Sequence, residues 1–169
     1  MKTETANNPE LEKVRGFIDD IKVAMITTMD EEGNHRSRPM QTLKMDDDAC
    51  LWFFTDRHSP KLHEMQQNPN VNLSYADNDD QTYVSISGQA EQLDDETMKK
   101  ELWNPILKAW YPKGLDDPTL TLLKVKITHA DYWDGNASKM IEAFRIVKAI
   151  VMGERHGYGD EGKIKVQAN

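Results

Sequence analysis

Residues 71–88 read VNLSYADNDDQTYVSISG, and this stretch decides the class of fold. In both Val71–Tyr75 and Val84–Ser87 every second residue is apolar, with Asn or Ser in between. A period of two is typical of a strand with one buried and one exposed face. Gly88 follows directly, and a glycine inside a strand indicates a bulge or a close approach of another backbone segment. The stretch therefore predicts two neighbouring strands of an antiparallel sheet.

The rest of the chain adds strands on either side of this pair and helices around them. Strands are expected over residues 23–29, 36–45, 50–55 and 123–127, with polar turns at 30–34 and 46–48. The run Leu51–Phe54 contains no polar residue, which indicates a strand buried on both faces. Helices are expected over residues 9–21, 60–67, 95–111 and 138–152, the third with a break at Pro105. About six strands, mostly antiparallel and hairpin-linked, predict a small β-barrel with peripheral helices, a mainly β (α+β) fold, rather than alternating βαβ units.

The length is that of a single domain. The chain has 169 residues and no internal repeat, low-complexity tract or Gly/Ser linker that would mark a boundary. We expect one domain over residues 1–169, with its core over about 10–152. Residues 153–169 are rich in Gly and charge, and we expect a loose tail there.

Composition excludes several classes of protein. The chain has 21 basic and 29 acidic residues, a net charge of −8 and a pI near 5.1, which argues against a nucleic-acid partner because such proteins need a basic face. The single Cys50 excludes an intrachain disulfide and a cysteine zinc cluster. No apolar stretch approaches the ~20 residues of a spanning helix, and the first residues lack the apolar region of a signal peptide. We expect a soluble cytoplasmic protein with no membrane partner.

Positive charge is concentrated in two short segments. Residues 35–44 contain three basic residues and no acid, and residues 57–63 contain two more and no acid. These segments carry five positive charges in a chain of net charge −8, so the remainder carries −13. Basic segments in an acidic chain indicate a localised anion rather than a polyanion.

The second basic segment suggests how an anion is bound. Ser59 suits a helix N-cap, Pro60 suits the first helical position, and Lys61 follows at once. Backbone N–H groups, the helix dipole, a hydroxyl and an ammonium group would meet there, as a phosphate monoester requires. The alternative is that this is only a helix start with a solvated lysine. Arg38, from a neighbouring strand, favours the phosphate site because its guanidinium group could complete it.

Several motifs together resemble one family. Phe54–Lys61, FTDRHSPK, resembles the T-x-x-x-S-x-K phosphate loop of the pyridoxamine 5′-phosphate oxidase-like FMN-binding split barrels, and Lys44 stands eleven residues before its Thr, as in those oxidases. Four other segments are similar to the general stress protein 26 branch: Ser37–Met40, Tyr83–Ala90, Leu102–Trp103 and Ala130–Asp134. The resemblance spans about residues 10–152.

The resemblance implies a homodimer of six-stranded split barrels with one FMN in each of two interface clefts. By position it assigns Arg38, Ser59 and Lys61 to the phosphate of FMN. Thr55 and Asp56 would line the ribityl–phosphate end, and Pro39 and Met40 would lie along the isoalloxazine ring. Lys44 and Tyr83 would be further neighbours of the ring. Trp103, Trp110 and Trp133 could flank a flavin or could be core or interface residues, as aromatic side chains of this size usually are. Of the three, Trp103 is the candidate for contact with the cofactor edge across the dimer.

The sequence also departs from the true oxidases. Pro60 stands where they have a second basic residue, and Arg155-His156 lacks the spacing of their C-terminal Arg-x-His tract. We therefore do not expect oxidation of pyridoxamine phosphate. The function expected is a flavin-dependent oxidoreductase with a small-molecule redox partner such as NADH or NADPH. A non-catalytic flavin reservoir or redox sensor, and a cofactor-free interaction module, are the alternatives. FAD or a deazaflavin is the alternative to FMN.

Other kinds of site are not indicated. The five histidines are scattered, without metal-ligand spacing, so no metal site is predicted. Ser85 and Ser87 lack the elbow motif of a hydrolase nucleophile. No residue stands out as a general acid or base, and no catalytic residue is assigned.

Overall fold

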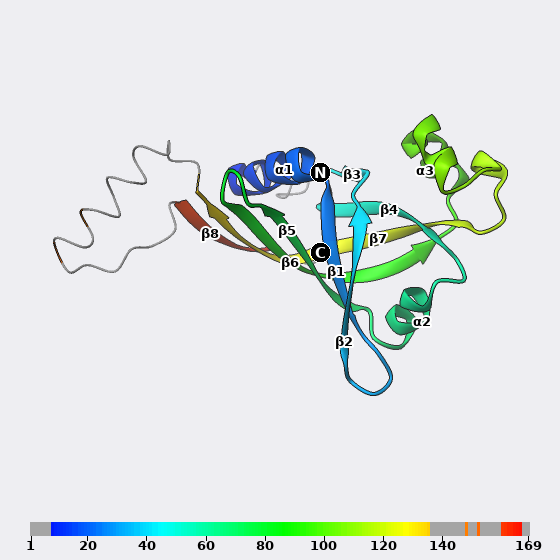
Figure 1. The fold of residues 1–169 in the computed structure, drawn as a ribbon, viewed down its shortest axis with the longest axis horizontal. Helices are drawn as coiled ribbons and strands as arrows, with labels where there is room; N and C mark the ends of the chain where they lie inside the picture. Colours follow the sequence, from blue (N-terminus) through cyan, green and yellow to red (C-terminus); the bar gives the residue numbers. More distant parts are fainter. Residues whose placement is uncertain (1–7, 136–147, 149–151, 153–159, 167–169) are drawn as a thin grey trace.

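The computed structural model describes residues 8–135, 148, 152 and 160–166, which form a strongly curved antiparallel sheet with helices at its periphery (Figure 1). The helices are α1 (Pro9–Ile21), α2 (Pro60–Gln67), α3 (Glu96–Leu102) and the 3-10 helices η2 (Pro105–Ala109) and η3 (Gly114–Asp116). The strands are β1 (Val23–Met29), β2 (His35–Gln41), β3 (Lys44–Met45), β4 (Cys50–Asp56), β5 (Asn70–Asp77), β6 (Thr82–Leu93), β7 (Leu120–Asp134) and β8 (Asp160–Lys165). The mainly β fold with peripheral helices predicted from the sequence is confirmed.

The sheet closes into a barrel because its two edge strands are neighbours in the chain. The strand order is β2-β1-β5-β6-β7-β4-β3, and β8 pairs with β7 in addition. β2 and β3 stand at opposite ends of this order, yet only Thr42 and Leu43 separate them. Thr42 N donates to Lys22 O (2.8 Å) and Leu43 N donates to Trp52 O (2.9 Å), which ties the connection to both edges. We call this connection, residues 41–44, the seam.

The hairpin predicted from residues 71–88 is confirmed. β5 and β6 pair antiparallel from Asn70 opposite Gln89 to Asp77 opposite Thr82. The pairing of β6 with β7 shifts register between Ser87 and Gly88, which is the predicted bulge. The close approach is present as well, because a Cβ atom built on Gly88 would lie 2.7 Å from the carbonyl oxygen of Lys126.

β4 is buried on both faces, as the run Leu51–Phe54 predicts. Leu51 and Phe53 face the barrel interior, together with alternate residues of the other strands and the inner face of α1. Trp52 and Phe54 face the other way and form a second apolar cluster with two leucines of β7. The segment that contains α3, η2 and η3 packs over this cluster.

Several elements differ in extent from the sequence prediction; β6, for example, extends to Leu93. The expected strand over 36–45 is divided into β2 and β3 by the seam, and β7 is longer than the expected 123–127. The expected helix over 95–111 is divided into α3 and η2, with η2 beginning at Pro105. Of the expected helix over 138–152 only residues 148 and 152 are described, so this prediction lies outside the described residues. In the part of the chain that is described, no helix is both long enough and apolar enough to cross a membrane.

Part of the expected loose tail forms a strand, β8. The described residues therefore form eight strands, whereas about six were predicted. β8 pairs with β7 from His129 opposite Lys165 to Asp134 opposite Asp160. Ile164 and Val166 are buried in the barrel core, each 7% exposed. The prediction of a loose tail is wrong for residues 160–166 because β7 extends far enough to offer an edge with which they pair.

Candidate functional site

A cleft of about 460 Å³ opens beside the seam. It is lined by Val23, Pro39, Met40, Gln41, Leu43, Phe54, Thr55, Asp56, Lys61, Leu107, Trp110 and Tyr111. Five of the residues assigned to the cofactor from the sequence, those at 39, 40, 55, 56 and 61, therefore meet in one place. They come from β2, from the end of β4 and from the first turn of α2.

Lys61 supplies the positive charge of this cleft. Ser59 is the N-cap residue of α2 and Pro60 lies in its first turn, as predicted. The Ser59 side chain makes no capping hydrogen bond; its hydroxyl oxygen accepts one from Lys61 Nζ at 2.7 Å. Burial, and secondly the charge of nearby Arg38, lower the pKa of the Lys61 ammonium group. A partly desolvated cation next to a second cation is stabilised by an anion.

Arg38 lies next to Lys61 and is held in an ion pair. Its Nη2 donates to Glu64 Oε1 of α2 at 2.8 Å, and its Nη1 donates to Thr28 Oγ1 of β1 at 2.7 Å. The hydrogen bond from Arg38 is the first cause that lowers the pKa of the Glu64 carboxyl group. A guanidinium group has five N–H donors, so Arg38 keeps donors for a ligand beyond these two contacts.

Thr55, which lines the cleft, has an unsatisfied hydroxyl group. The residue is 3% exposed, and within the described residues its Oγ1 atom is buried without a hydrogen-bond partner. Leaving a buried hydroxyl unpaired costs about 1–3 kcal/mol, so such groups are uncommon and call for an explanation. A polar group of a ligand in the cleft would supply the partner.

Asp56 closes the loop between β4 and α2. Its carboxylate accepts a hydrogen bond from the backbone N–H of His58 at 2.7 Å, and Ser59 N donates to the Asp56 carbonyl at 3.0 Å. The acid therefore shapes the loop that presents Lys61. Its carboxylate is also close enough to Lys61 to favour the charged form of that lysine.

An aromatic wall faces the cleft from η2 and the residues after it. Trp110 is 67% exposed although it is large and apolar, and Leu107 and Tyr111 lie beside it in the lining. Burial, then the charges of Asp56 and Asp117, raise the pKa of Tyr111 to about 12, so its hydroxyl remains a donor at neutral pH. From the sequence, Trp110 was one of three tryptophans that could flank a flavin, but neither Trp110 nor Tyr111 was assigned to the site; the adjacent Trp and Tyr were the available signal.

Five of the residues assigned from the sequence lie outside the lining. Arg38 and Ser59 adjoin it through Lys61, whereas Lys44, Trp103 and Tyr83 make other contacts. Lys44 forms an ion pair with Glu101 of α3 (Nζ to Oε1, 2.6 Å). Trp103 packs edge-on against Phe54, with ring centroids 6.0 Å apart, and so stands behind a lining residue. Their contacts with a cofactor remain predictions.

Tyr83 is remote from the cleft within one chain. It pairs with Trp133 of β7, whereas Thr55 pairs with Thr121 of the same strand. Twelve positions of β7 separate these pairs, which is roughly 40 Å of extended strand. Its hydroxyl donates to Asn78 Oδ1 at 3.3 Å. A ring contact made by Tyr83 therefore remains a prediction that requires a second protomer.

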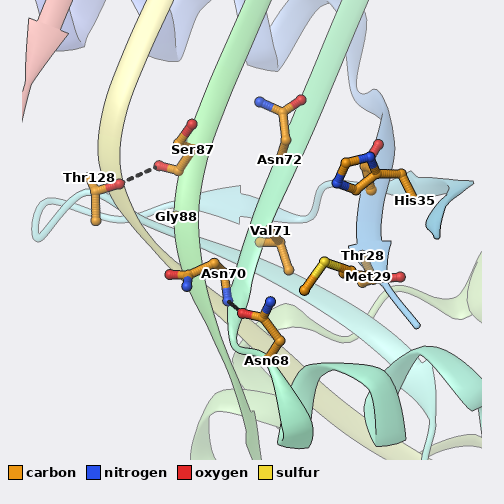
Figure 2. A pocket seen from close by; sticks show the side chains of 11 residues that line it. Thr28, Met29, His35, Asn68, Asn70, Val71, Asn72, Ser87, Gly88 and Thr128 are labelled. Carbon is orange, nitrogen blue, oxygen red and sulfur yellow. Dashed lines mark hydrogen bonds between the residues drawn. The ribbon is translucent and has the colours of Figure 1, made fainter. Parts of the chain in front are cut away.

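A second hollow, of about 590 Å³, lies between β1, β5, β6 and β7 and is lined mainly by neutral polar side chains (Figure 2). Figure 2 shows Asn72 and Ser87 on neighbouring strands, with Thr128 Oγ1 donating to the Ser87 carbonyl oxygen at 3.0 Å. Its lining contains no Lys or Arg and none of the residues assigned to the cofactor. Although it is larger, this hollow lacks the charge that a phosphate needs.

The lining of the cleft at the seam combines a cationic group with apolar and aromatic side chains, which suits a ligand with an anionic group and a flat body. Lys61 and Arg38 would bind the anion, and Thr55, whose hydroxyl is unpaired, lines the same cleft. Pro39 and Met40 line one side and Trp110 belongs to the aromatic wall, which suits a planar ring system. Among the described residues, no group of three or more His, Cys, Asp or Glu side chains is arranged to hold a metal ion.

The chain is similar to known proteins in both sequence and fold. The family model described as pyridoxamine 5′-phosphate oxidase like matches residues 9–157. The chain is similar to the general stress FMN/FAD binding protein of Xanthomonas citri, with 30% identity, a TM-score of 0.67, and coverage of 78% of this chain and 93% of that one. It is similar to the general stress protein 26 of Bacillus anthracis, with 27% identity, a TM-score of 0.61, and coverage of 70% and 92%. Protein bli-3 of Neurospora crassa is 23% identical over 164 residues, which cover 91% of this chain and 78% of that protein.

Proposed function

The chain belongs to the pyridoxamine 5′-phosphate oxidase-like family, and we propose that it is an FMN-binding flavoprotein of the general stress type. Its activity would be electron transfer between the flavin and a small molecule, with NADH or NADPH as the reductant to be tested first. The X. citri relative is described as an FMN/FAD binding protein. This description supports a flavin, and FMN is our choice because the cleft has one compact cationic end.

The unpaired hydroxyl of Thr55 is the observation that carries this proposal. It belongs to a residue that lines the same cleft as Lys61, whose pKa is lowered by burial and by Arg38. An unsatisfied hydroxyl and two adjacent cations each cost free energy in the protein alone, and a phosphate monoester with its polyol chain would remove both costs. A protein that only binds other proteins, without a cofactor, would have no use for the unpaired hydroxyl or for the two adjacent cations.

Each part of the cleft has a role in this proposal. Lys61, Arg38 and the Ser59 hydroxyl would bind the phosphate, with Thr55 near the ribityl chain. Pro39 and Met40 would lie along the ring. When bound, the flavin supplies the hydride and electron chemistry, while the protein binds it, orients it and tunes its surroundings. Asp56 would contribute by shaping the phosphate loop, because its carboxylate already bonds His58 N.

The test begins with the absorbance spectrum of the protein after incubation with FMN and removal of free flavin. We expect one FMN per chain, with FAD and riboflavin retained less well. Failure to retain any flavin would overturn the proposal. Anaerobic titration with NADH and NADPH then separates an oxidoreductase from a flavin reservoir or sensor, since only the former is reduced on a catalytic timescale. Hydrogen peroxide release with pyridoxine 5′-phosphate should stay far below the ~10 s⁻¹ typical of enzymes.

A homodimer is part of the same proposal. Val23, Met25 and Trp110 are 47%, 42% and 67% exposed, and two of them line the cleft. Large apolar side chains gathered at a surface are typical of a protein interface. We therefore expect two protomers to meet at this face, each covering the flavin site of the other.

Met25→Glu should disrupt this dimer, because it places a charge in the apolar face without altering a residue that lines the cleft. We expect the dissociation constant of the dimer to rise by about 30-fold or more, the scale of an interface hot spot. Sedimentation at micromolar concentration measures it. Gln66→Glu, which adds the same charge on the exposed side of α2, is the control and should leave the dimer intact. A monomeric wild type that retains stoichiometric FMN would contradict this expectation.

A further inference from the structure

Glu64 has no role in the cofactor assignment drawn from the sequence, yet it binds the arginine assigned to the phosphate. We propose that Glu64 and Thr28 are positioning residues that fix the guanidinium group of Arg38 beside Lys61 and so set the affinity of the cleft for the phosphate of its ligand. This inference rests on the proposed function, because it concerns the same anion.

The three side chains form a closed set of hydrogen bonds. Arg38 Nη2 donates to Glu64 Oε1 at 2.8 Å, and Arg38 Nη1 donates to Thr28 Oγ1 at 2.7 Å. The Thr28 hydroxyl donates in turn to the second carboxylate oxygen of Glu64. Each residue therefore bonds both of the others.

The set is well enclosed and connects three separate elements. Thr28 on β1 is 1% exposed, and the side chains of Glu64 on α2 and Arg38 on β2 are 12% and 27% exposed. An ion pair in this setting is screened much less by salt than one on the surface. A long arginine side chain, which otherwise samples many rotamers, is thus held in one orientation.

Two opposing effects of Glu64 on an anion can be separated. Its negative charge offsets one of the two positive charges of Arg38 and Lys61, so charge alone predicts that removing it strengthens phosphate binding. Its hydrogen bonds hold Arg38 in place, so positioning predicts the reverse. Because fixed donors bind an anion without a further entropy cost, we expect positioning to dominate.

The experiment compares Glu64→Gln with wild type in its affinity for FMN and for riboflavin, measured by flavin fluorescence quenching on the full chain. We expect FMN affinity to fall about tenfold, the scale of one hydrogen bond to a charged group, and riboflavin affinity to change less than about twofold. Glu31→Gln is the matched control. It removes the same charge from a carboxylate that pairs with His63, the residue before Glu64, and should leave both affinities unchanged.

A second pair of variants tests the same network at Thr28. Thr28→Val keeps the shape of the buried side chain but removes the hydroxyl, and should lower FMN affinity as Glu64→Gln does. Thr28→Ser keeps the hydroxyl and should retain wild-type affinity. Thermal melting of each variant shows whether it is folded, and a merely structural role would weaken FMN and riboflavin binding alike.

The outcomes distinguish this inference from the proposed function. A wild type that binds no flavin overturns the proposed function. FMN binding in Glu64→Gln that equals or exceeds that of wild type overturns the positioning role and leaves the proposed function standing. Equal losses for FMN and riboflavin, or a loss in Thr28→Ser as large as that in Thr28→Val, also overturn it.

Discussion

Lys61→Ala is expected to weaken FMN binding by about 10- to 150-fold, which corresponds to the loss of about 1.5–3 kcal/mol of charged hydrogen bonding. The lysine is the charged donor that lines the cleft, and its pKa is lowered by burial and by Arg38. Arg38→Ala should have an effect of the same size. It also leaves the Glu64 carboxylate without its cation, next to an incoming phosphate. Titration of apoprotein with FMN, followed by fluorescence or calorimetry, gives both numbers.

Riboflavin and a surface lysine supply the controls for this result. Riboflavin lacks the phosphate, so it should bind the wild type weakly and lose little more in either variant. Lys113→Ala removes the same charge from an exposed position before η3 and should change FMN affinity by less than about twofold. If Lys61→Ala and Arg38→Ala both keep wild-type affinity, the phosphate does not lie where we have placed it.

Gly88→Ala is expected to destabilise the fold by about 3 kcal/mol, at the upper end of the cost of overpacking. The added Cβ atom would lie 2.6 Å from Val125 Cγ1 and 2.7 Å from the Lys126 carbonyl oxygen. A side chain can turn away, but the carbonyl belongs to the β6–β7 ladder at the bulge and cannot move without breaking pairing. Thermal melting should show a midpoint lower by roughly 6–12 °C for a chain of this size.

Gly16→Ala is the matched control, with the opposite expected sign. Gly16 lies inside α1, and apart from the backbone of that helix and the residues next to it no described atom is within 4 Å of the position of a Cβ atom. Alanine there should stabilise the protein by about 0.5–1 kcal/mol, because glycine in a helix loses more backbone entropy on folding. Equal melting temperatures for Gly88→Ala and wild type would show that the bulge tolerates a side chain and that the close approach is less rigid than described.

Local features were predictable wherever neighbours in the chain determine the conformation. The alternation in Val71–Tyr75 and Val84–Ser87 specifies strands because a strand has a period of two. Pro60 and Pro105 each lie in the first turn of a helical segment, as the fixed φ of proline favours. The uninterrupted run Leu51–Phe54 implied that both faces of its strand are covered, but not which segments cover them.

The eighth strand, β8, could not be predicted from its own sequence. Residues Asp160–Lys165 contain a single isoleucine among charged residues and glycine, which is too little alternation to indicate a strand. They pair because β7 continues to Asp134 and offers an edge. Whether an edge is available depends on the length and place of another strand, and not on the sequence of the segment that joins it.

Some features of the candidate site were likewise predictable from the sequence, and others depend on the tertiary structure. By itself the sequence determined that a helix begins at Ser59 and Pro60 with Lys61 in its first turn, because helix capping and charge are local properties. Only the tertiary structure decided that Trp110 lines the cleft and that Glu64 holds Arg38. Glu64 lies 26 residues from Arg38 in the chain, and their contact exists only because α2 packs against β1, the strand that pairs with β2. Long-range contacts of this kind depend on how the whole sheet curves and closes, and no local period or capping preference encodes that closure.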